Sequence, residues 1–178
     1  MANRNVEALE AALNIGDVVG VNYLSIQTDG HIHRVGDACN SKAFMGFSGV
    51  GADTTLTTED TYYKVTGTYV SSGLVRFSAT SAGVLTYEGL GDCCLFNGTA
   101  DMQVDKVCDI TVALYLNGAL VTAAQSPHSF TAASKTSNLA ITSLTSLATN
   151  DYLEVCAKSS VAATELTVKT LAVTFWGA

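Results

Sequence analysis

The amino-acid sequence predicts an all-β protein, and three observations support this fold class. Hydrophobic residues make up 48% of the 178 residues and charged residues only 14%, which suits a packed core and argues against a disordered chain. In several short segments apolar residues recur at every second position, which is the period of a half-buried strand. Gly, Asn, Asp and Ser separate these segments, and β-branched residues are abundant within them.

The clearest strands lie after residue 108. Residues 109–118 alternate strictly and end in Asn117-Gly118, a pair that supplies the positive backbone angles of a tight hairpin turn. A second alternating run covers residues 152–158 after the turn residues Thr-Asn-Asp. The side chains expected to fill the core from these two runs are Ile110, Val112, Leu114, Leu153 and Val155.

Further short segments between residues 43 and 147 bring the expected total to roughly eight to ten strands, the density of a sandwich or barrel. We predict a polar loop through Pro127, with His128 as a loop residue. In the last strand the apolar parity changes between Val168 and Leu171. An extra residue near Lys169-Thr170, forming a β-bulge, accounts for this change.

Residues 1–40 differ in their periodicity from the rest of the chain. Asn5 is placed to cap a short helix with Val6, Leu9 and Leu13 on one face. Thr28-Asp29-Gly30 lies between two apolar segments, 23–26 and 32–35, which predicts a small hairpin. A helix of three turns or fewer and one hairpin are too slight to fold alone. We therefore expect residues 1–40 to form a docking arm, with residues 41–178 as the main domain. The residues expected to dock are Val6, Leu9, Leu13 and Tyr23.

The charge pattern argues against nucleic-acid and membrane partners. The formal net charge is −7 without a concentrated basic patch, whereas nucleic-acid binding needs clustered Lys and Arg. No apolar run approaches the roughly 20 residues that span a bilayer. The polar start leads into no apolar core of a signal peptide, so we expect a soluble protein made in the cytoplasm.

The sequence contains few residues in patterns typical of catalytic or metal-binding sites. His31 and His33 lie two residues apart beside Asp29 and Asp37, a spacing that can ligate a metal, although the polar face of an edge hairpin is the favoured interpretation. Nucleophile-elbow, phosphate-loop and zinc-protease motifs are absent from the sequence, as is any Cys-x-x-Cys pair among the five cysteines. We expect reduced thiols, no enzyme activity, no cofactor and no metal.

Seven segments follow one another in a distinctive order over about three-quarters of the chain. They are residues 43–44, 63–68 (Tyr-Lys-Val-Thr-Gly-Thr), 85–89 (Leu-Thr-Tyr-Glu-Gly), 96–102, 112–118, 147–155 and 166–168. This order resembles the jelly-roll domain of the tumour-necrosis-factor (TNF) and complement-globular-head superfamily, in the branch common among phage and virus structural proteins. The resemblance implies a two-sheet antiparallel jelly-roll sandwich that assembles as a homotrimer.

Subunit contact would also explain large aromatic side chains on the outer face of a strand, which are costly to expose. The parity of Tyr115 and Tyr152 places them opposite the apolar core face. The residues expected at the trimer interface are Tyr115, Tyr152, Phe175 and Trp176.

The resemblance, the arm and the lack of catalytic motifs together favour a capsid decoration (cement) protein of a bacteriophage. Such a protein would bind the major capsid protein as a trimer, stabilise the head and reside on the capsid surface of the virion. The alternative is the receptor- or glycan-binding head of a phage tail or head fibre, but no fibre shaft precedes the domain in this sequence. A β-sandwich hydrolase and a secreted cytokine-like ligand are disfavoured, the second because no secretion signal is evident.

Overall fold

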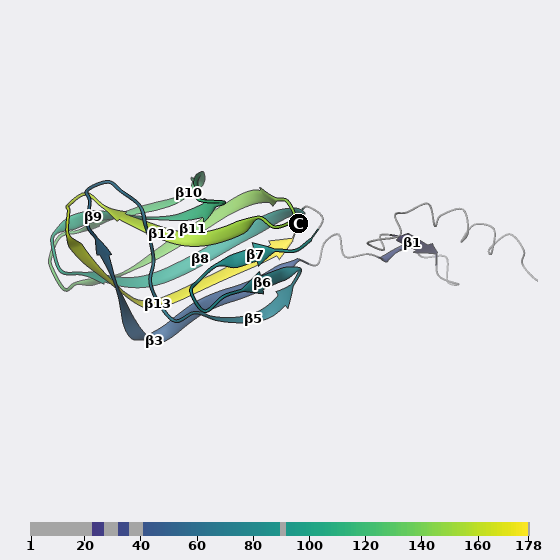
Figure 1. Cartoon of the computed structure of the whole chain (residues 1–178), viewed down its shortest axis with the longest axis horizontal. Coiled ribbons are helices and arrows are strands. Elements are labelled where there is room, and N and C mark those ends of the chain that lie inside the picture. Colours follow the sequence, from purple (N-terminus) through teal and green to yellow (C-terminus); the bar gives the residue numbers. More distant parts are fainter. Residues whose placement is uncertain (1–22, 27–31, 36–40, 90–91, 178) are drawn as a thin grey trace, which may run out of the picture. The chain divides into compact units, whose positions relative to one another are not determined.

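The computed structural model describes residues 23–26, 32–35, 41–89 and 92–177 (Figure 1). The chain divides into two compact units, Met1–Asn40 and Ser41–Ala178. In the first unit β1 (Tyr23–Ile26) pairs antiparallel with β2 (Ile32–Val35), which confirms the predicted pairing of these two segments. The predicted helix, with Val6, Leu9 and Leu13, lies outside the described residues, and only the backbone of Tyr23 is described.

The second unit consists of two antiparallel sheets, which confirms the predicted all-β, jelly-roll sandwich class. Its strands are β3 (Lys42–Leu56), β4 (Tyr63–Lys64), β5 (Val70–Val75), β6 (Phe77–Ala79), β7 (Leu85–Tyr87), β8 (Asp92–Val104), β9 (Cys108–Leu116), β10 (Ala119–Phe130), β11 (Thr136–Leu147), β12 (Tyr152–Ser159) and β13 (Thr164–Gly177). We name each sheet after its middle strand. The β13 sheet has the order β11-β8-β13-β3-β5, and the β12 sheet has the order β10-β9-β12-β7-β6, with β4 also paired to β12. Among the described residues no helix is long and apolar enough to cross a membrane.

The core lies between the two sheets and contains the inward side chains of both. As predicted, Ile110, Val112, Leu114, Leu153 and Val155 are buried in it. The core holds a cluster of aromatic rings. In it Phe175 is 1% exposed and its ring centroid lies 5.1 Å from that of Phe96 and 5.7 Å from that of Phe77. This corrects the interface predicted for Phe175, because a fully buried ring is not available to a second subunit.

The predicted Asn117-Gly118 hairpin joins β9 to β10, with backbone φ angles of 52° and 76°. These positive angles are the reason for Asn and Gly at this turn. The Asn117 side chain also ties the turn to the loop before β12, because its Nδ2 donates to Asp151 Oδ1 at 2.6 Å and its Oδ1 accepts from the Tyr152 amide at 2.9 Å.

The predicted bulge in the last strand is confirmed. The register of β13 shifts between Val168 and Thr170 against both of its neighbours, β3 and β8. Lys169 is the extra residue relative to β8, whereas at the shift against β3 the additional residues lie on β3. Because Lys169 is exposed, Val168 and Leu171 on either side of the bulge both face the core. The bulge therefore keeps every large apolar side chain of β13 up to Phe175 on the inner side.

The predicted loop through Pro127 is wrong, because β10 continues through it to Phe130. Pro127 lies opposite Thr111 of β9. A proline is tolerated here because β10 is an edge strand with no neighbour in its sheet on the other side. His128 is consequently a strand residue, with its Nε2 2.7 Å from Ser137 Oγ.

Candidate functional site

A row of exposed apolar side chains crosses the outer face of the β13 sheet. Leu144 lies opposite Leu95, and Leu95 in turn lies opposite Trp176. These side chains are 62%, 38% and 56% exposed respectively, and Lys42 ends the row on β3. We call Leu144, Leu95 and Trp176 the apolar row. Contiguous exposed apolar side chains of this size are typical of a surface that another protein covers.

The next rows of the same face carry short, uncharged side chains together with one phenylalanine. Cross-strand pairing aligns Thr142, Asn97, Thr174 and Phe44 in one row and Ala140, Thr99, Ala172 and Gly46 in the following one. Short side chains let a second surface approach the sheet closely, and they present few charges that would have to be desolvated. The face is thus suited to close contact over several strands.

The carboxylate of Asp101 lies at the border of this uncharged region and is held in place by hydrogen bonds. Asp101 accepts hydrogen bonds from Asn138 Nδ2 and Thr170 Oγ1, each at 2.8 Å. These two bonds, with a smaller contribution from Lys169, lower the pKa of the Asp101 carboxyl below its usual range. Asp101 is therefore ionised at neutral pH and held by its own sheet.

In β11 buried and exposed positions alternate regularly, but beside the apolar row the polarity of the side chains at these positions is the reverse of the usual one. Ser143 and Thr145 are buried, whereas Leu144 between them points to solvent. A strand that only had to fill the core would place the leucine inside and the hydroxyls outside. The inversion is a departure from the local rule of the kind found at functional surfaces. It is also the sequence signal through which Leu144 could have been recognised.

The four residues predicted at a trimer interface do not share one surface. Tyr115 and Tyr152 belong to the outer parity of the β12 sheet, because Leu114 and Leu153 beside them are buried. Trp176 lies on the outer face of the opposite sheet, and Phe175 is in the core. The Tyr115 ring is already partly covered within the chain, since its centroid lies 5.3 Å from that of Tyr62.

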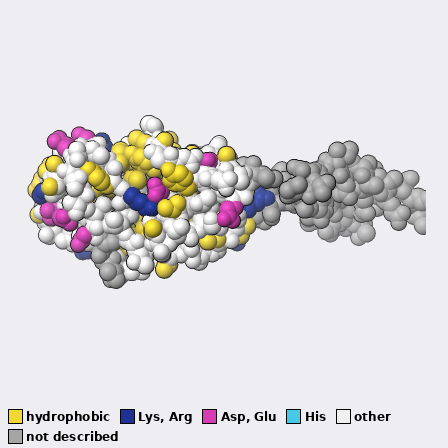
Figure 2. All heavy atoms as spheres, in the orientation of Figure 1, with side chains coloured by type: hydrophobic (Ala, Val, Ile, Leu, Met, Phe, Trp, Pro, Cys, Tyr) yellow, Lys and Arg dark blue, Asp and Glu magenta, His cyan; other side chains and the backbone are white. Residues whose placement is uncertain are grey.

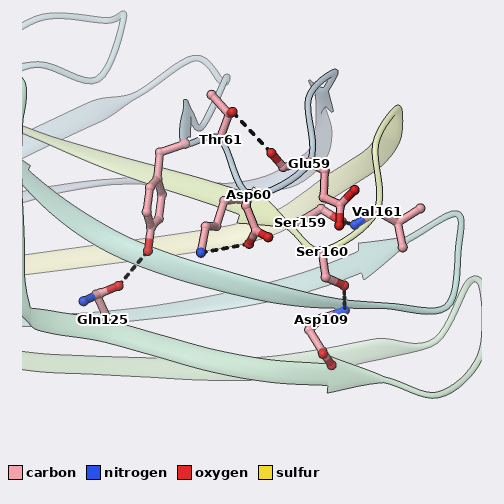
Figure 3. Close-up of polar contacts among 10 residues, drawn as sticks. Glu59, Asp60, Thr61, Asp109, Gln125, Ser159, Ser160 and Val161 are labelled. Atoms are coloured by element: carbon pink, nitrogen blue, oxygen red, sulfur yellow. Dashed lines mark hydrogen bonds and ion pairs between the residues drawn. The ribbon is translucent and has the colours of Figure 1, made fainter.

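The outer face of the β12 sheet carries a polar depression of about 430 Å³. Its lining residues are Asp60, Asp109, Thr111, Pro127, His128, Ser129, Lys158 and Ser160. Lys158 Nζ lies 2.9 Å from Asp60 Oδ1, and this hydrogen bond raises the pKa of the lysine. Figure 3 draws the contacts around the depression, from Asp109 at one end to Gln125 at the other, where the Tyr62 hydroxyl donates to Gln125 Oε1 at 2.7 Å.

Charged side chains are sparse over the surface seen in Figure 2, where Lys, Arg, Asp and Glu lie singly or in small mixed groups among hydrophobic and uncharged atoms. Within the described part of the chain, no group of three or more His, Cys, Asp or Glu side chains is arranged to hold a metal ion. His33, one of the two histidines considered as ligands, lies in β2 opposite Ser25, and His31 is outside the described residues.

The fold is similar to solved structures of TNF-family proteins. Eiger TNF from S. frugiperda superposes with a TM-score of 0.58 at 11% identity, over 79% of this chain and 93% of that chain. The chain folds as a TNF-like jelly roll. Murine APRIL is similar too, with TM-scores of 0.52 at 10% identity (pH 5.0) and 0.51 at 12% identity (pH 8.5), each over 78% of this chain and 100% of that one. Neither a protein-family model nor a curated protein sequence matches this chain.

Proposed function

We propose that this chain is a homotrimeric structural protein of a phage virion that decorates the capsid. The observation that carries the proposal is the apolar row, set in register across the outer face of a TNF-like jelly roll. The proposed role is adhesive, so it requires neither a catalytic step nor a cofactor.

Trimerisation through the β13 sheet is the first part of the proposal. Burying a Leu or Trp side chain completely contributes about 1.5–3 kcal/mol relative to leaving it exposed. Burying three such side chains in one row therefore favours association of subunits, and the short side chains beside them allow the subunits to approach closely. Of the aromatic residues predicted at the interface, Trp176 is the one that belongs to this face.

Capsid binding through residues 1–40 is the second part. These residues form a unit separate from the jelly roll. We propose that Val6, Leu9, Leu13 and Tyr23 contact the major capsid protein. A single arm would bind weakly, whereas a trimer presents three arms at high effective concentration and gains avidity. Joining neighbouring capsomers in this way would strengthen the head, and the protein would reside on the capsid surface after synthesis in the host cytoplasm.

The trimer is tested by substituting the apolar row. Sedimentation-equilibrium mass of the full chain is expected to correspond to three subunits, and Trp176→Ser with Leu144→Ser is expected to shift it to one. The matched control is Val107→Ser, which removes a side chain that is 61% exposed in the turn between β8 and β9, away from the row. A double variant that remains fully trimeric would contradict the assignment of this face.

Capsid binding is tested by deleting residues 2–36 and mixing the trimer with capsids of the encoding phage that lack this protein. We expect the shortened chain to keep its trimer mass and to lose capsid occupancy, measured by co-sedimentation. Full occupancy without residues 2–36 would rule out the docking arm.

A second candidate function is the receptor- or glycan-binding head of a phage fibre. The polar depression on the β12 sheet favours this alternative, because it provides a concave site with convergent polar groups. Glycan binding without any affinity for capsids would make this the better assignment.

A further inference from the structure

We propose that the polar depression on the β12 sheet binds a neutral saccharide. The inference is independent of the capsid-decoration role, since it concerns the opposite face of the sandwich. At about 430 Å³ the depression falls within the roughly 300–1,000 Å³ range of small-molecule sites.

Rigid strands set the positions of the lining groups. Thr111 of β9 lies opposite both Pro127 of β10 and Lys158 of β12, so these three residues form one row across the sheet. In the next row, two hydrogen bonds join Asp109 of β9 to Ser160, the residue that follows β12. The Asp109 amide donates to Ser160 Oγ at 2.9 Å, and the Ser160 amide donates to the Asp109 carbonyl at 2.9 Å. Groups held on paired strands need little reordering when a ligand binds.

The two carboxylates of the depression have different surroundings. The backbone amide of Asp60 donates a hydrogen bond to the Ser159 carbonyl at 2.8 Å. The Asp60 carboxylate forms an ion pair with Lys158. The Asp109 carboxylate, by contrast, makes no hydrogen bond or ion pair with any residue that the structure describes. Asp109 therefore offers two acceptor oxygens to a ligand, while the Asp60–Lys158 pair offers both an acceptor and a donor.

This set of groups matches the chemistry of sugar hydroxyls. A hydroxyl donates to a carboxylate and accepts from an ammonium group, and the hydroxyls of Thr111 and Ser129 can do either. The Pro127 ring adds an apolar surface on the same row, and the Tyr62 ring lies nearby, with its centroid 5.5 Å from Lys158 Nζ. Such apolar surfaces suit the C–H side of a sugar ring.

The charges favour a neutral saccharide over an acidic one. Two carboxylates face one lysine in the depression, so an anionic sugar would bring a third negative charge to the site. If subunits join through the β13 sheet, the depression on the opposite face remains open to solvent. Assembly and ligand binding can therefore operate together.

The test uses the full chain and an array of neutral and sialylated glycans, followed by saturation-transfer NMR with the free monosaccharide of any glycan that binds. We expect binding to neutral glycans, a signal from the free sugar, and no requirement for metal in the presence of EDTA. Array binding without any free-sugar signal would mean that the protein recognises the carrier and would overturn the proposal.

Two variants locate the site. Asp109→Asn keeps the size of the side chain but removes its charge, and Lys158→Met removes the donor; each is expected to weaken binding by roughly tenfold or more. The matched control is Glu88→Gln, at an exposed carboxylate that does not line the depression, and it should bind normally. Unaltered melting temperatures and subunit mass separate loss of the site from loss of the fold. Absence of neutral-glycan binding, preference for sialylated glycans, or full binding by both variants would each overturn the proposal. None of these outcomes changes the trimer or capsid measurements.

Discussion

Leu114 and Tyr115 are chain neighbours on β9 whose side chains point to opposite sides of the β12 sheet. Leu114 is fully buried, so Leu114→Ala should lower the free energy of unfolding by about 2–5 kcal/mol, measured by urea denaturation. Tyr115 packs against Tyr62 within the same chain. We expect Tyr115→Ala to reduce stability modestly and to leave the subunit mass unchanged. A fall in mass would show that the outer face of the β12 sheet takes part in assembly.

Cys156 gives the stability a characteristic pH dependence. Burial, with a smaller contribution from Glu154, raises the pKa of its thiol from 9.0 to about 12. Between these values the unfolded chain has ionised while the folded chain keeps its proton, so stability is complete below pH 9 and falls as the pH rises. We expect a loss of about 2–3 kcal/mol between pH 9 and 11 that the Cys156→Ala variant does not show. Equal slopes for the two proteins in urea denaturation would contradict this.

In β13, a single residue determines which side chains of the strand face the core. Deleting Lys169 would remove the bulge and move Phe175 to the solvent face and Trp176 into the core. We expect the deletion variant to lose cooperative thermal unfolding, followed by circular dichroism. Lys169→Ala serves as the control and should melt almost normally, because the lysine is exposed and its contacts within the described part of the chain are a hydrogen bond to Thr136 and a minor electrostatic contribution at Asp101. A cooperative deletion variant would show that the extra residue is dispensable.

Elements also differ in how far their sequence predicts them. The Asn117-Gly118 hairpin and the bulge were predictable because each depends on a local property, the positive φ of a turn or the parity of neighbouring side chains. The loop predicted through Pro127 was wrong because an edge strand accepts a proline, and edge position depends on the order of strands in the sheet.

For the whole molecule, assembly and stability should be linked. If the folded chain is trimeric, the melting temperature should rise with protein concentration, because association stabilises the folded state by mass action. We expect the Trp176→Ser, Leu144→Ser variant to melt at a temperature that does not depend on concentration over the same range. Scanning calorimetry at several concentrations measures both. A wild-type melting temperature that is independent of concentration would argue against coupled trimerisation.

The sequence alone determined the fold class of this protein, because alternation with period two and turn residues act locally along the chain. It also determined that Leu114 faces inward and Tyr115 outward. Only the tertiary structure decided which outward residues meet. Leu144, Leu95 and Trp176 come from three strands far apart in sequence, and their alignment depends on non-local pairing register. The polar depression likewise needed the edge placement of Pro127 and the docking of Asp60 beside Lys158. Alternation along a strand predicts which side of the sheet a side chain faces. Which side chains lie next to one another on that side depends on strand order and register.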